Sequence, residues 1–188
     1  GGGGFLAFDV CPANRVLNAL AELERMAYDD GGALAARGKV DYALLQQLNS
    51  LPYYTMPYPK SLANEFGTEV VYPLVRQAMT ERGLSTADGL RTYVEHIALQ
   101  VARAVEALGG GTRMLATGGG AHNTFLVERL RSRLGLEAVV PDERLVNYKE
   151  ALIMALIGVL RWREENNVLA SVTGASRDSI GGAVWMGQ

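Results

Sequence analysis

Two groups of residues in this sequence have the type and the setting that chemistry requires. The first is Asp9, which follows the apolar run FLAF and precedes Pro12, a residue typical of the first turn of a helix. A helix N-terminus keeps a nearby carboxylate ionised, and an ionised carboxylate can serve as a general base near neutral pH. An aspartate in this position is equally suited to capping the turn, so the residue by itself leaves both roles open.

The second group is the run of glycines Gly118, Gly119 and Gly120, which lies between a short apolar run and Asn123. Glycine is needed where the backbone takes a positive φ or where another group approaches the main chain closely. A strand, a glycine turn and a helix capped by Asn123 would present main-chain N–H groups to a phosphate or another polar ligand. A tight turn with close helix packing explains the same residues without a ligand, and both interpretations stay open.

The glycine run matches known nucleotide motifs only in part. The spacing of a Walker loop is absent. A dinucleotide fingerprint, G-x-G-x-x-G, is matched at Gly118 and Gly120 but has Asn123 in place of the third glycine. Glu137 or Asp142 lies at a suitable distance to serve as its acidic residue. An NAD-type dinucleotide-binding domain is therefore an alternative prediction.

The remaining titratable residues indicate no further site. His96 and His122 are 26 positions apart and the chain has one cysteine, Cys11, so no metal-ligand spacing is present and no metal site is predicted from these residues. No serine–histidine–aspartate or cysteine–histidine arrangement is found. Glu150 lies at the start of the apolar run ALIMALIGVL, where a carboxylate either is exposed or faces a polar site.

Composition excludes several classes of partner. The formal net charge is −2 and the basic residues are scattered, which argues against nucleic acid and anionic membranes as partners. A single cysteine allows no internal disulfide. The longest apolar stretch, residues 151–160, is too short to span a bilayer. We therefore expect a cytoplasmic protein.

Strands and helices alternate in the predicted elements, so the fold class is α/β. We expect a buried strand at 5–8, a helix beginning near Pro12, a short helix before Gly38, another over 40–50 and a proline-rich extended segment over 51–61. The clearest helix spans residues 86–108, capped by Ser85 or Thr86. Strands follow at 113–116 and 136–140, on either side of a helix from Asn123. The last predicted helix, 147–165, is expected to be largely buried.

Several stretches, taken in order, resemble one family, the anhydro-N-acetylmuramic acid kinases of the sugar-kinase, Hsp70 and actin superfamily. FDVCPANRVLN is similar to the family's D-T-G-P-G-N segment, and GGGAHN is similar to its nucleotide loop. The resemblance also extends over the run from Tyr28 to Ser61 and over the C-terminal helix with its TGA ending. In the FDVCPANRVLN segment the matching residues are Asp9, Pro12 and Asn14. In the run from Tyr28 to Ser61 they are Tyr28, Asp29, Gly32, Gly38, Val40, Pro52, Tyr53, Pro59, Lys60 and Ser61.

The resemblance implies an enzyme that uses ATP and Mg²⁺ to phosphorylate 1,6-anhydro-N-acetylmuramic acid, with hydrolytic ring opening to N-acetylmuramic acid 6-phosphate, in cell-wall recycling. It implies that Asp9 is the general base that activates water. Gly118, Gly119, Gly120 and Asn123 would line the adenosine end of the ATP site. Asn14 and Glu150 would contact the amino sugar, and together with Asp9 they would face the same crevice as the glycines.

The resemblance also implies the wider architecture. Residues 5–188 would form the C-terminal lobe of a two-lobed kinase, a ribonuclease H-like lobe with a mixed sheet flanked by helices. The four glycines at 1–4 themselves, and not the resemblance, lead us to expect a linker or an artificial addition there. The N-terminal lobe of the same kinase would be a partner, and the family implies a homodimer. A catalytically inactive lobe that only binds sugar or nucleotide is a further alternative.

The sequence departs from the family pattern next to Asp9. Val10, Cys11 and Ala13 replace the threonine and both glycines of D-T-G-P-G-N. If those glycines allow a close approach of the sugar or a phosphate, Cys11 and Ala13 would crowd it and alter specificity. Lys60 and Ser61 match the family, but the resemblance assigns them no role.

Overall fold

The structure is a computed structural model that describes residues 5–57 and 60–187. The predicted linker at residues 1–4 and the motif residue Pro59 lie outside the described residues. In chain order the elements are α1 (Asn14–Ala21), α2 (Ala33–Arg37), α3 (Tyr42–Asn49), α4 (Tyr72–Arg82), α5 (Thr86–Ala107), β1 (Arg113–Leu115), α6 (Thr124–Leu134), β2 (Glu137–Val139), α7 (Glu143–Trp162) and α8 (Ala170–Thr173), with short helical turns between several of them.

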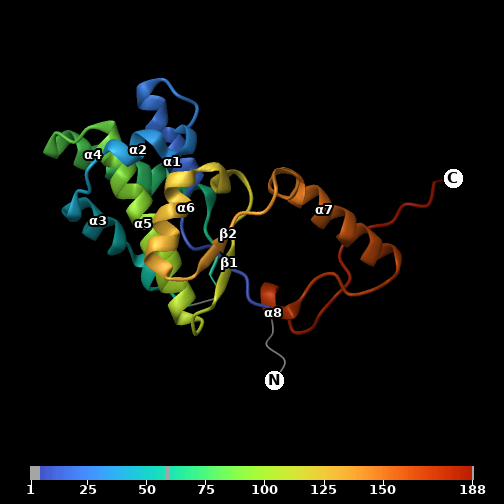
Figure 1. Ribbon diagram of the computed structural model, residues 1–188. Helices are drawn as coiled ribbons and strands as arrows, with labels where there is room; N and C mark the ends of the chain where they lie inside the picture. The colour runs from blue at the N-terminus through green and yellow to red at the C-terminus, as the bar shows by residue number, and fades with distance from the viewer. Residues whose placement is uncertain (1–4, 58–59, 188) are drawn as a thin grey trace.

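Helix α5 is the centre of the fold, and helices α1, α2, α3, α4 and α6 pack around it (Figure 1). Its start is set by a capping box. The Ser85 hydroxyl accepts from the Asp88 N–H, and the Asp88 carboxylate accepts from the Ser85 N–H. This confirms the sequence prediction of a long helix capped at Ser85. The continuous apolar stripe along α5 explains why this helix is buried on most of its length.

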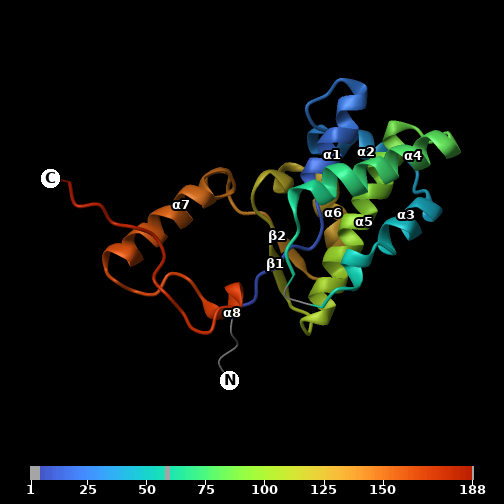
Figure 2. The same cartoon turned by 180° about the vertical axis from the view of Figure 1, so that it is seen from behind.

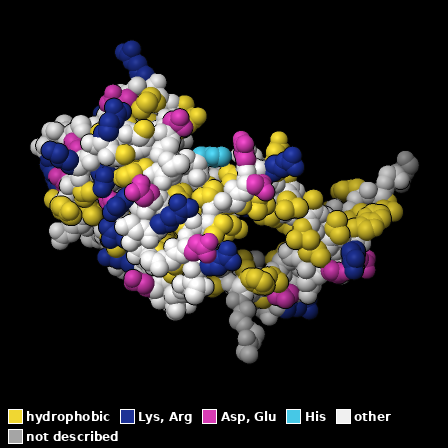
Figure 3. Space-filling model, in the orientation of Figure 1, with side chains coloured by type: hydrophobic (Ala, Val, Ile, Leu, Met, Phe, Trp, Pro, Cys, Tyr) yellow, Lys and Arg dark blue, Asp and Glu magenta, His cyan; other side chains and the backbone are white. Residues whose placement is uncertain are grey.

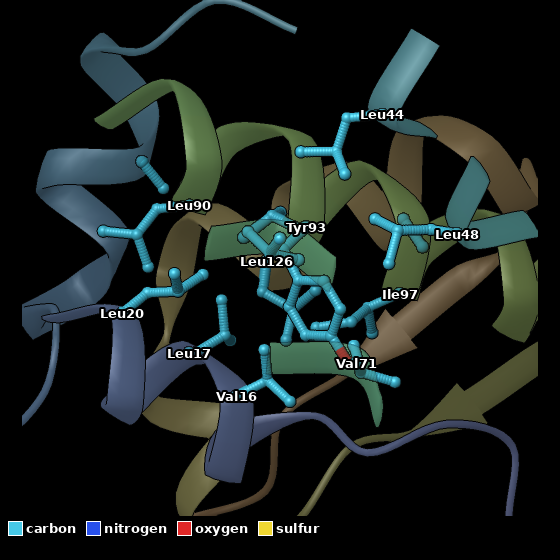
Figure 4. Packing of buried hydrophobic residues seen from close by; sticks show 14 of the residues in the cluster. Val16, Leu17, Leu20, Leu44, Leu48, Val71, Leu90, Tyr93, Ile97 and Leu126 are labelled. Atoms are coloured by element: carbon cyan, nitrogen blue, oxygen red, sulfur yellow. The ribbon is translucent and has the colours of Figure 1, made fainter. Parts of the chain in front are cut away.

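The core gathers around the Tyr93 ring, with side chains from several helices directed toward it (Figure 4). Leu20 from α1, Leu44 from α3 and Leu90 from α5 are fully buried, and Leu126 from α6 is almost so. The Tyr93 hydroxyl donates to the Pro12 carbonyl, so the ring is held at its polar end as well. This contact fixes the segment that leads from Asp9 into α1 against the core.

An ion-pair cluster joins α5 to α6. Glu95 is almost completely buried, and its carboxylate lies 2.6 Å from Arg129 Nε and 3.1 Å from Arg133 Nη2. Burial raises the pKa of Glu95, but the hydrogen bonds from Arg129 and Arg133 outweigh burial and hold that pKa below its usual value. The cluster therefore stabilises the packing of the helix that follows the glycine run.

The sheet is small. Strands β1 and β2 pair in parallel, with Arg113 opposite Glu137 and Leu115 opposite Val139, and α6 connects them. The chain is thus of mixed α and β structure, as predicted, but mostly helical. The predicted mixed sheet is not observed, because the described residues form one two-stranded parallel sheet. The predicted buried strand at 5–8 is wrong, since no strand is assigned to these residues and Phe5 is 74% exposed.

Helix α7 departs most from the prediction. It begins four residues earlier than expected, with the Asp142 carboxylate accepting from the Leu145 N–H, and it ends at Trp162. It projects away from helices α1 to α6 in both views (Figures 1 and 2). Only Val146 in this helix is buried, so the expectation of a largely buried helix is wrong. Within the described residues, no helix combines the length and the apolarity needed to cross a membrane.

Candidate active site

Gly119, the middle residue of the glycine run, lines a cavity of about 500 Å³, whereas Gly118 and Gly120 are not among its lining residues. The volume is within the range of about 300–1,000 Å³ typical of small-molecule sites. We call this cavity the glycine-loop cavity. Four segments that are distant in sequence contribute to it: the start of α1, the loop before α2, the turn before α6 and the start of α7. The lining residues are Asn14, Leu17, Asn18, Tyr28, Asp29, Asp30, Gly31, Gly119, His122, Asn123, Glu143 and Asn147.

In the turn between β1 and α6, Gly118 requires glycine for its conformation, whereas Gly119 and Gly120 lie at ordinary contact distance from Asn14. Gly118 has φ +74°, a conformation that side chains rarely adopt. A Cβ atom on Gly119 would lie 3.4 Å from the Asn14 amide nitrogen, and one on Gly120 would lie 3.5 Å from the Asn14 amide oxygen. The predicted sequence of strand, glycine turn and helix is confirmed, and Asn14 lies directly against the turn.

Asn123 caps α6, as its position in the sequence predicts. Its side-chain oxygen accepts from the Leu126 N–H at 2.9 Å. Gly32, with φ +75°, approaches this cap so closely that a Cβ atom there would lie 2.4 Å from the Asn123 side-chain oxygen. The Thr124 hydroxyl donates to the Gly31 carbonyl at 3.0 Å. The loop before α2 is therefore held onto the start of α6.

The same loop is fixed from its other side. Both carboxylate oxygens of Asp29 accept main-chain N–H groups at the start of α2, from Leu34 at 2.8 Å and from Ala35 at 2.9 Å. Across the cavity, His122 Nε2 lies 3.3 Å from the Asn147 side-chain oxygen, which links the turn to α7. Sequence reasoning from residue types missed Asn147, because nothing in its local pattern signals a contact with a residue 25 positions away.

Asp9 lines a different cavity, of about 490 Å³, together with Ala7, Phe8, Lys60, Ser61, Val172, Thr173 and Gly174. We call it the Asp9 cavity. Asp9 and Asn14 are five residues apart, a stretch of chain that spans at most about 17 Å. Within the described residues, Asp9 and Gly119 line separate cavities, and the expectation that Asp9 and the glycine run face one crevice stays a prediction.

The Asp9 main chain and carboxylate are both held by the segment 53–62. The Asp9 N–H donates to the Lys60 carbonyl at 3.0 Å, and the Tyr53 hydroxyl donates to the Asp9 carbonyl at 2.6 Å. The Leu62 N–H donates to Asp9 Oδ2 at 2.8 Å. These three contacts explain how a residue outside any strand or helix keeps a defined orientation.

The buried side chain of Lys60 contacts Tyr53, one of the residues that hold Asp9. Its Nζ donates to the Tyr53 carbonyl at 2.9 Å and lies 4.5 Å from the centre of the Tyr53 ring. Burial lowers the pKa of Lys60. Lys60, to which the sequence assigned no role, therefore ties together the segment that holds Asp9.

Comparisons with known proteins identify the family of this chain. A profile of the family described as anhydro-N-acetylmuramic acid kinase matches residues 2–187. The chain belongs to this family. The resemblance drawn from the Asp9 segment, the glycine run and the C-terminal helix is thereby confirmed, and the dinucleotide-binding alternative is not favoured.

Individual relatives cover nearly all of this chain but only part of their own length. An anhydro-N-acetylmuramic acid kinase of Rhodococcus erythropolis is 36% identical over 189 residues, which is 97% of this chain and 47% of the relative. Those of Xanthomonas oryzae pv. oryzae and Saccharophagus degradans are 37% and 30% identical over 190 and 183 residues, each match covering 49% of the relative. The chain spans about half the length of the curated relatives it matches.

The positions where the chain departs from the family motif do not obstruct either cavity. Cys11 and Ala13 pack against the core and line neither the glycine-loop cavity nor the Asp9 cavity. Burial raises the pKa of the Cys11 thiol to about 12, so the thiol stays protonated at neutral pH and is a poor nucleophile. The effect of these replacements on specificity stays a prediction.

Glu150 lies on α7, is exposed and lines neither cavity. It follows Glu143 by seven residues, so it lies on the same side of the helix about 10 Å further along. Because Glu143 lines the glycine-loop cavity, Glu150 lies on the same face of α7 as a residue of that cavity. Its predicted contact with the sugar stays a prediction.

The charges around the glycine-loop cavity indicate the kind of group that it accepts. Asp29, Asp30 and Glu143 line it, and none of its described lining residues is a lysine or an arginine. Such a lining repels a polyphosphate but suits a neutral group with many hydrogen-bonding atoms. The amides of Asn14, Asn18 and Asn147 supply donors and acceptors for such a group.

Proposed function

We propose that this chain supplies the adenosine site and the general base of a kinase that phosphorylates 1,6-anhydro-N-acetylmuramic acid with ATP and opens its anhydro ring. The product would be N-acetylmuramic acid 6-phosphate, formed during cell-wall recycling. The observation that carries the proposal is the glycine-loop cavity, in a chain whose whole length matches this kinase family. The lack of a second cysteine supports a cytoplasmic setting.

Adenosine is the part of ATP that the glycine-loop cavity suits. Adenine and ribose are uncharged and rich in polar atoms, which agrees with the amide and carboxylate lining. The half-exposed Tyr28 ring offers the base a flat apolar surface. Gly119 and Gly120 lie against Asn14, and Gly119 and Asn14 both line the cavity in which we place the ligand. The phosphates would leave the cavity away from its three carboxylates.

Asp9 is proposed as the base. Its carboxylate would take a proton from a water molecule, and the resulting hydroxide would attack the anomeric carbon of the sugar. The bond from that carbon to O6 breaks, O6 takes the γ-phosphoryl group, and ADP leaves. Phosphoryl transfer depends mainly on positioning and charge stabilisation, so one held carboxylate is sufficient chemistry for this half of the enzyme. The hydrogen bond from the Leu62 N–H holds the Asp9 carboxylate in a defined position.

Asn14 and Glu150 are proposed as sugar contacts. Asn14 is the residue of the glycine-loop cavity nearest to Asp9 in sequence, which supports a place between nucleotide and sugar. We further propose that the full-length protein has a ribonuclease H-like lobe, in which the two-stranded sheet would be extended by strands outside the described residues. A homodimer, as the family implies, also stays a prediction.

The described residues do not fit a dedicated Mg²⁺ site. Among them no three histidine, cysteine, aspartate or glutamate side chains gather closely enough to hold a metal ion. Mg²⁺ in kinases is held largely by the substrate phosphates, with one or two carboxylates. We therefore propose that Mg²⁺ enters with ATP, and we assign no residue of this chain to it.

The role of Asp9 is tested in a full-length family protein that carries this chain. Asp9→Asn keeps the side-chain oxygen that accepts the Leu62 N–H but removes the base, so kcat should fall about 10²–10⁴-fold with little change in Tm. Asp142→Asn is the matched control, because asparagine is also a good helix N-cap and Asp142 lines neither cavity. Full activity of the Asp9 variant would refute the proposed base.

The adenosine site is tested by calorimetric titration of ADP into the chain. Gly32→Ala and Gly83→Ala both place a side chain at positive φ, +75° and +63°, so both introduce backbone strain. Only Gly32→Ala also displaces the Asn123 side chain, whereas a Cβ atom on Gly83 meets nothing within 4 Å. We expect Gly32→Ala to weaken ADP binding at least tenfold and Gly83→Ala to leave it unchanged. Equal affinities in both variants would contradict the proposed site.

A further inference from the structure

Helix α7 carries an apolar surface that the described residues 5–57 and 60–187 leave uncovered. Residues 151–160, ALIMALIGVL, contain no charged or polar side chain. Leu152 is 61% exposed, Met154 65% and Leu156 56%. Single exposed apolar residues are ordinary, but a contiguous apolar patch of this kind marks an interaction surface.

The exposed side chains lie on opposite sides of the helix. At 100° per residue, Leu152, Leu156 and Val159 form one stripe, whereas Met154 lies about 200° around from Leu152. All four are more than half exposed. A helix that is apolar on every side is normally enclosed within a larger protein rather than laid on a surface.

Charged residues bound this surface at both ends. Lys149 and Glu150 precede the apolar run, and Arg161 and Arg163 follow it. An apolar centre with a charged rim is the usual composition of a protein–protein interface. Figure 3 shows hydrophobic side chains along α7 and around the opening between this helix and the body of the molecule.

The sheet also lacks a partner layer on one face within the described residues. The sheet has two strands of three residues each, and an isolated pair of strands is at best marginally stable. Leu115 on β1 is 60% exposed, although strand residues of this type usually pack against a second layer. The sheet, like α7, therefore exposes apolar surface within the described residues.

We infer that α7 is enclosed by the part of the family protein that lies outside this chain. The relatives have about twice the length that the match covers, so they contain a body of suitable size. A second copy of this chain is a less suitable occupant, because a two-fold pair of helices buries one stripe of each helix and would leave Met154 exposed. The inference depends on family membership and not on the kinase reaction.

The two tryptophans of the chain make the inference testable without a new probe site. Both lie in the C-terminal region: Trp162 at the end of α7 is 69% exposed, and Trp185 is 91% exposed. Trp185→Phe leaves Trp162 as the single tryptophan. The chain is labelled with 5-fluorotryptophan and titrated with the unlabelled half of the Rhodococcus erythropolis relative that the match does not cover. Fluorine NMR then reports on α7 alone.

We expect the Trp162 resonance to shift on titration and to lose its sensitivity to exchange of H₂O for D₂O. Leu152→Glu and Met154→Glu, on opposite sides of the helix, should each weaken binding at least tenfold. Tyr42→Glu is the control, because Tyr42 is 78% exposed on α3, in the body of the molecule. It should bind like the parent chain.

Other outcomes overturn the inference. A resonance that shifts with the concentration of the chain alone, and responds to Leu152→Glu but not to Met154→Glu, indicates a second copy. A shift on adding phosphatidylcholine vesicles, but not on adding the half-protein, indicates a lipid surface. If the separate half does not bind, the chain is placed within the full-length relative in exchange for the matched half. Amide exchange in α7 should then slow at least 100-fold, and an unchanged rate refutes the inference.

Discussion

Helices α5 and α7 are similar in length and in apolar content, but their surroundings differ completely. Helix α5 has 22 residues and buries twelve of them, including Leu90, Tyr93 and Val94. Helix α7 has 20 residues and buries only Val146. Both helices begin with a side-chain cap, so local sequence specifies each of them equally well. Burial in this molecule therefore depends on which elements surround a helix and not on the apolar residues that it carries.

The comparison suggests two kinds of stability within one chain. Helices α1 to α6 share a closed core, and a change in that core affects the whole body. The arm formed by α7 and α8 joins the body at the glycine-loop cavity and at the Asp9 cavity. We expect substitutions in the arm between these two attachments to have little effect on the free energy of unfolding of this chain. They should have a larger effect once the enclosing part of the protein is present.

The largest expected difference comes from one substitution made in both helices. Leu90→Ala, at a fully buried position in α5, should lower the free energy of unfolding by about 3 kcal/mol through lost burial and a residual cavity. Leu152→Ala, at a position in α7 that is 61% exposed, should change it by less than about 0.5 kcal/mol. Urea unfolding of both variants measures the difference. Similar losses would show that α7 is buried in the isolated chain.

A smaller effect is expected at the ion-pair cluster between α5 and α6. Glu95→Gln leaves Arg129 and Arg133 without their buried counter-charge. Because both arginines are partly exposed, the cost should be about 2 kcal/mol at pH 7, below that of a fully buried pair. The parent and the variant are compared by urea unfolding.

The pH dependence of this difference follows from the depressed pKa of Glu95. Its contribution is fully present above the unfolded glutamate pKa of about 4.3 and is lost as the pH falls through the lower folded value. The gap between parent and Glu95→Gln should therefore close in acid. A gap of the same size at pH 7 and at pH 2.5 would contradict this assignment.

The smallest effects are expected from a pair of glycines inside the two helices. A Cβ atom on Gly89 in α5 would lie 2.8 Å from Met79 Sδ, whereas one on Gly158 in α7 meets nothing within 4 Å. Gly89→Ala should destabilise the chain by about 1 kcal/mol through overpacking. Gly158→Ala should instead increase the helicity of α7, since alanine is favoured over glycine in a helix by up to about 1 kcal/mol. Circular dichroism and urea unfolding distinguish the two, and opposite signs are the expected result.

The parts of the fold that could be predicted from the sequence are those with local causes. Ser85 and Asn123 cap helices because their side chains accept from N–H groups three residues away. The glycine turn was found because Gly118 requires a positive φ. The helix Tyr72–Arg82 and the short helical segment Phe66–Val71 before it were missed, because Pro73 and Gly67 interrupt the apolar pattern. Caps, turns and apolar patterns are each read from only a few neighbouring residues, so prediction fails where such a pattern is interrupted.

The two wrong predictions of burial share one physical cause. Both the run at 5–8 and helix α7 were expected to be buried because they are apolar. Apolar residues gain from burial only when other elements enclose them, and no local pattern specifies those elements. Phe5 and Leu152 are accordingly exposed in this chain.

The sequence by itself determined the family, the position of the glycine turn and the caps of the helices that flank it. Only the tertiary structure decided that Asn14 and Gly32 meet at this turn, and that Tyr53 and Leu62 orient Asp9 in a cavity of its own. The reason is the range of the interactions. A cap or a turn is a property of neighbouring residues, whereas a site is formed by contacts between segments that only the packed core brings together.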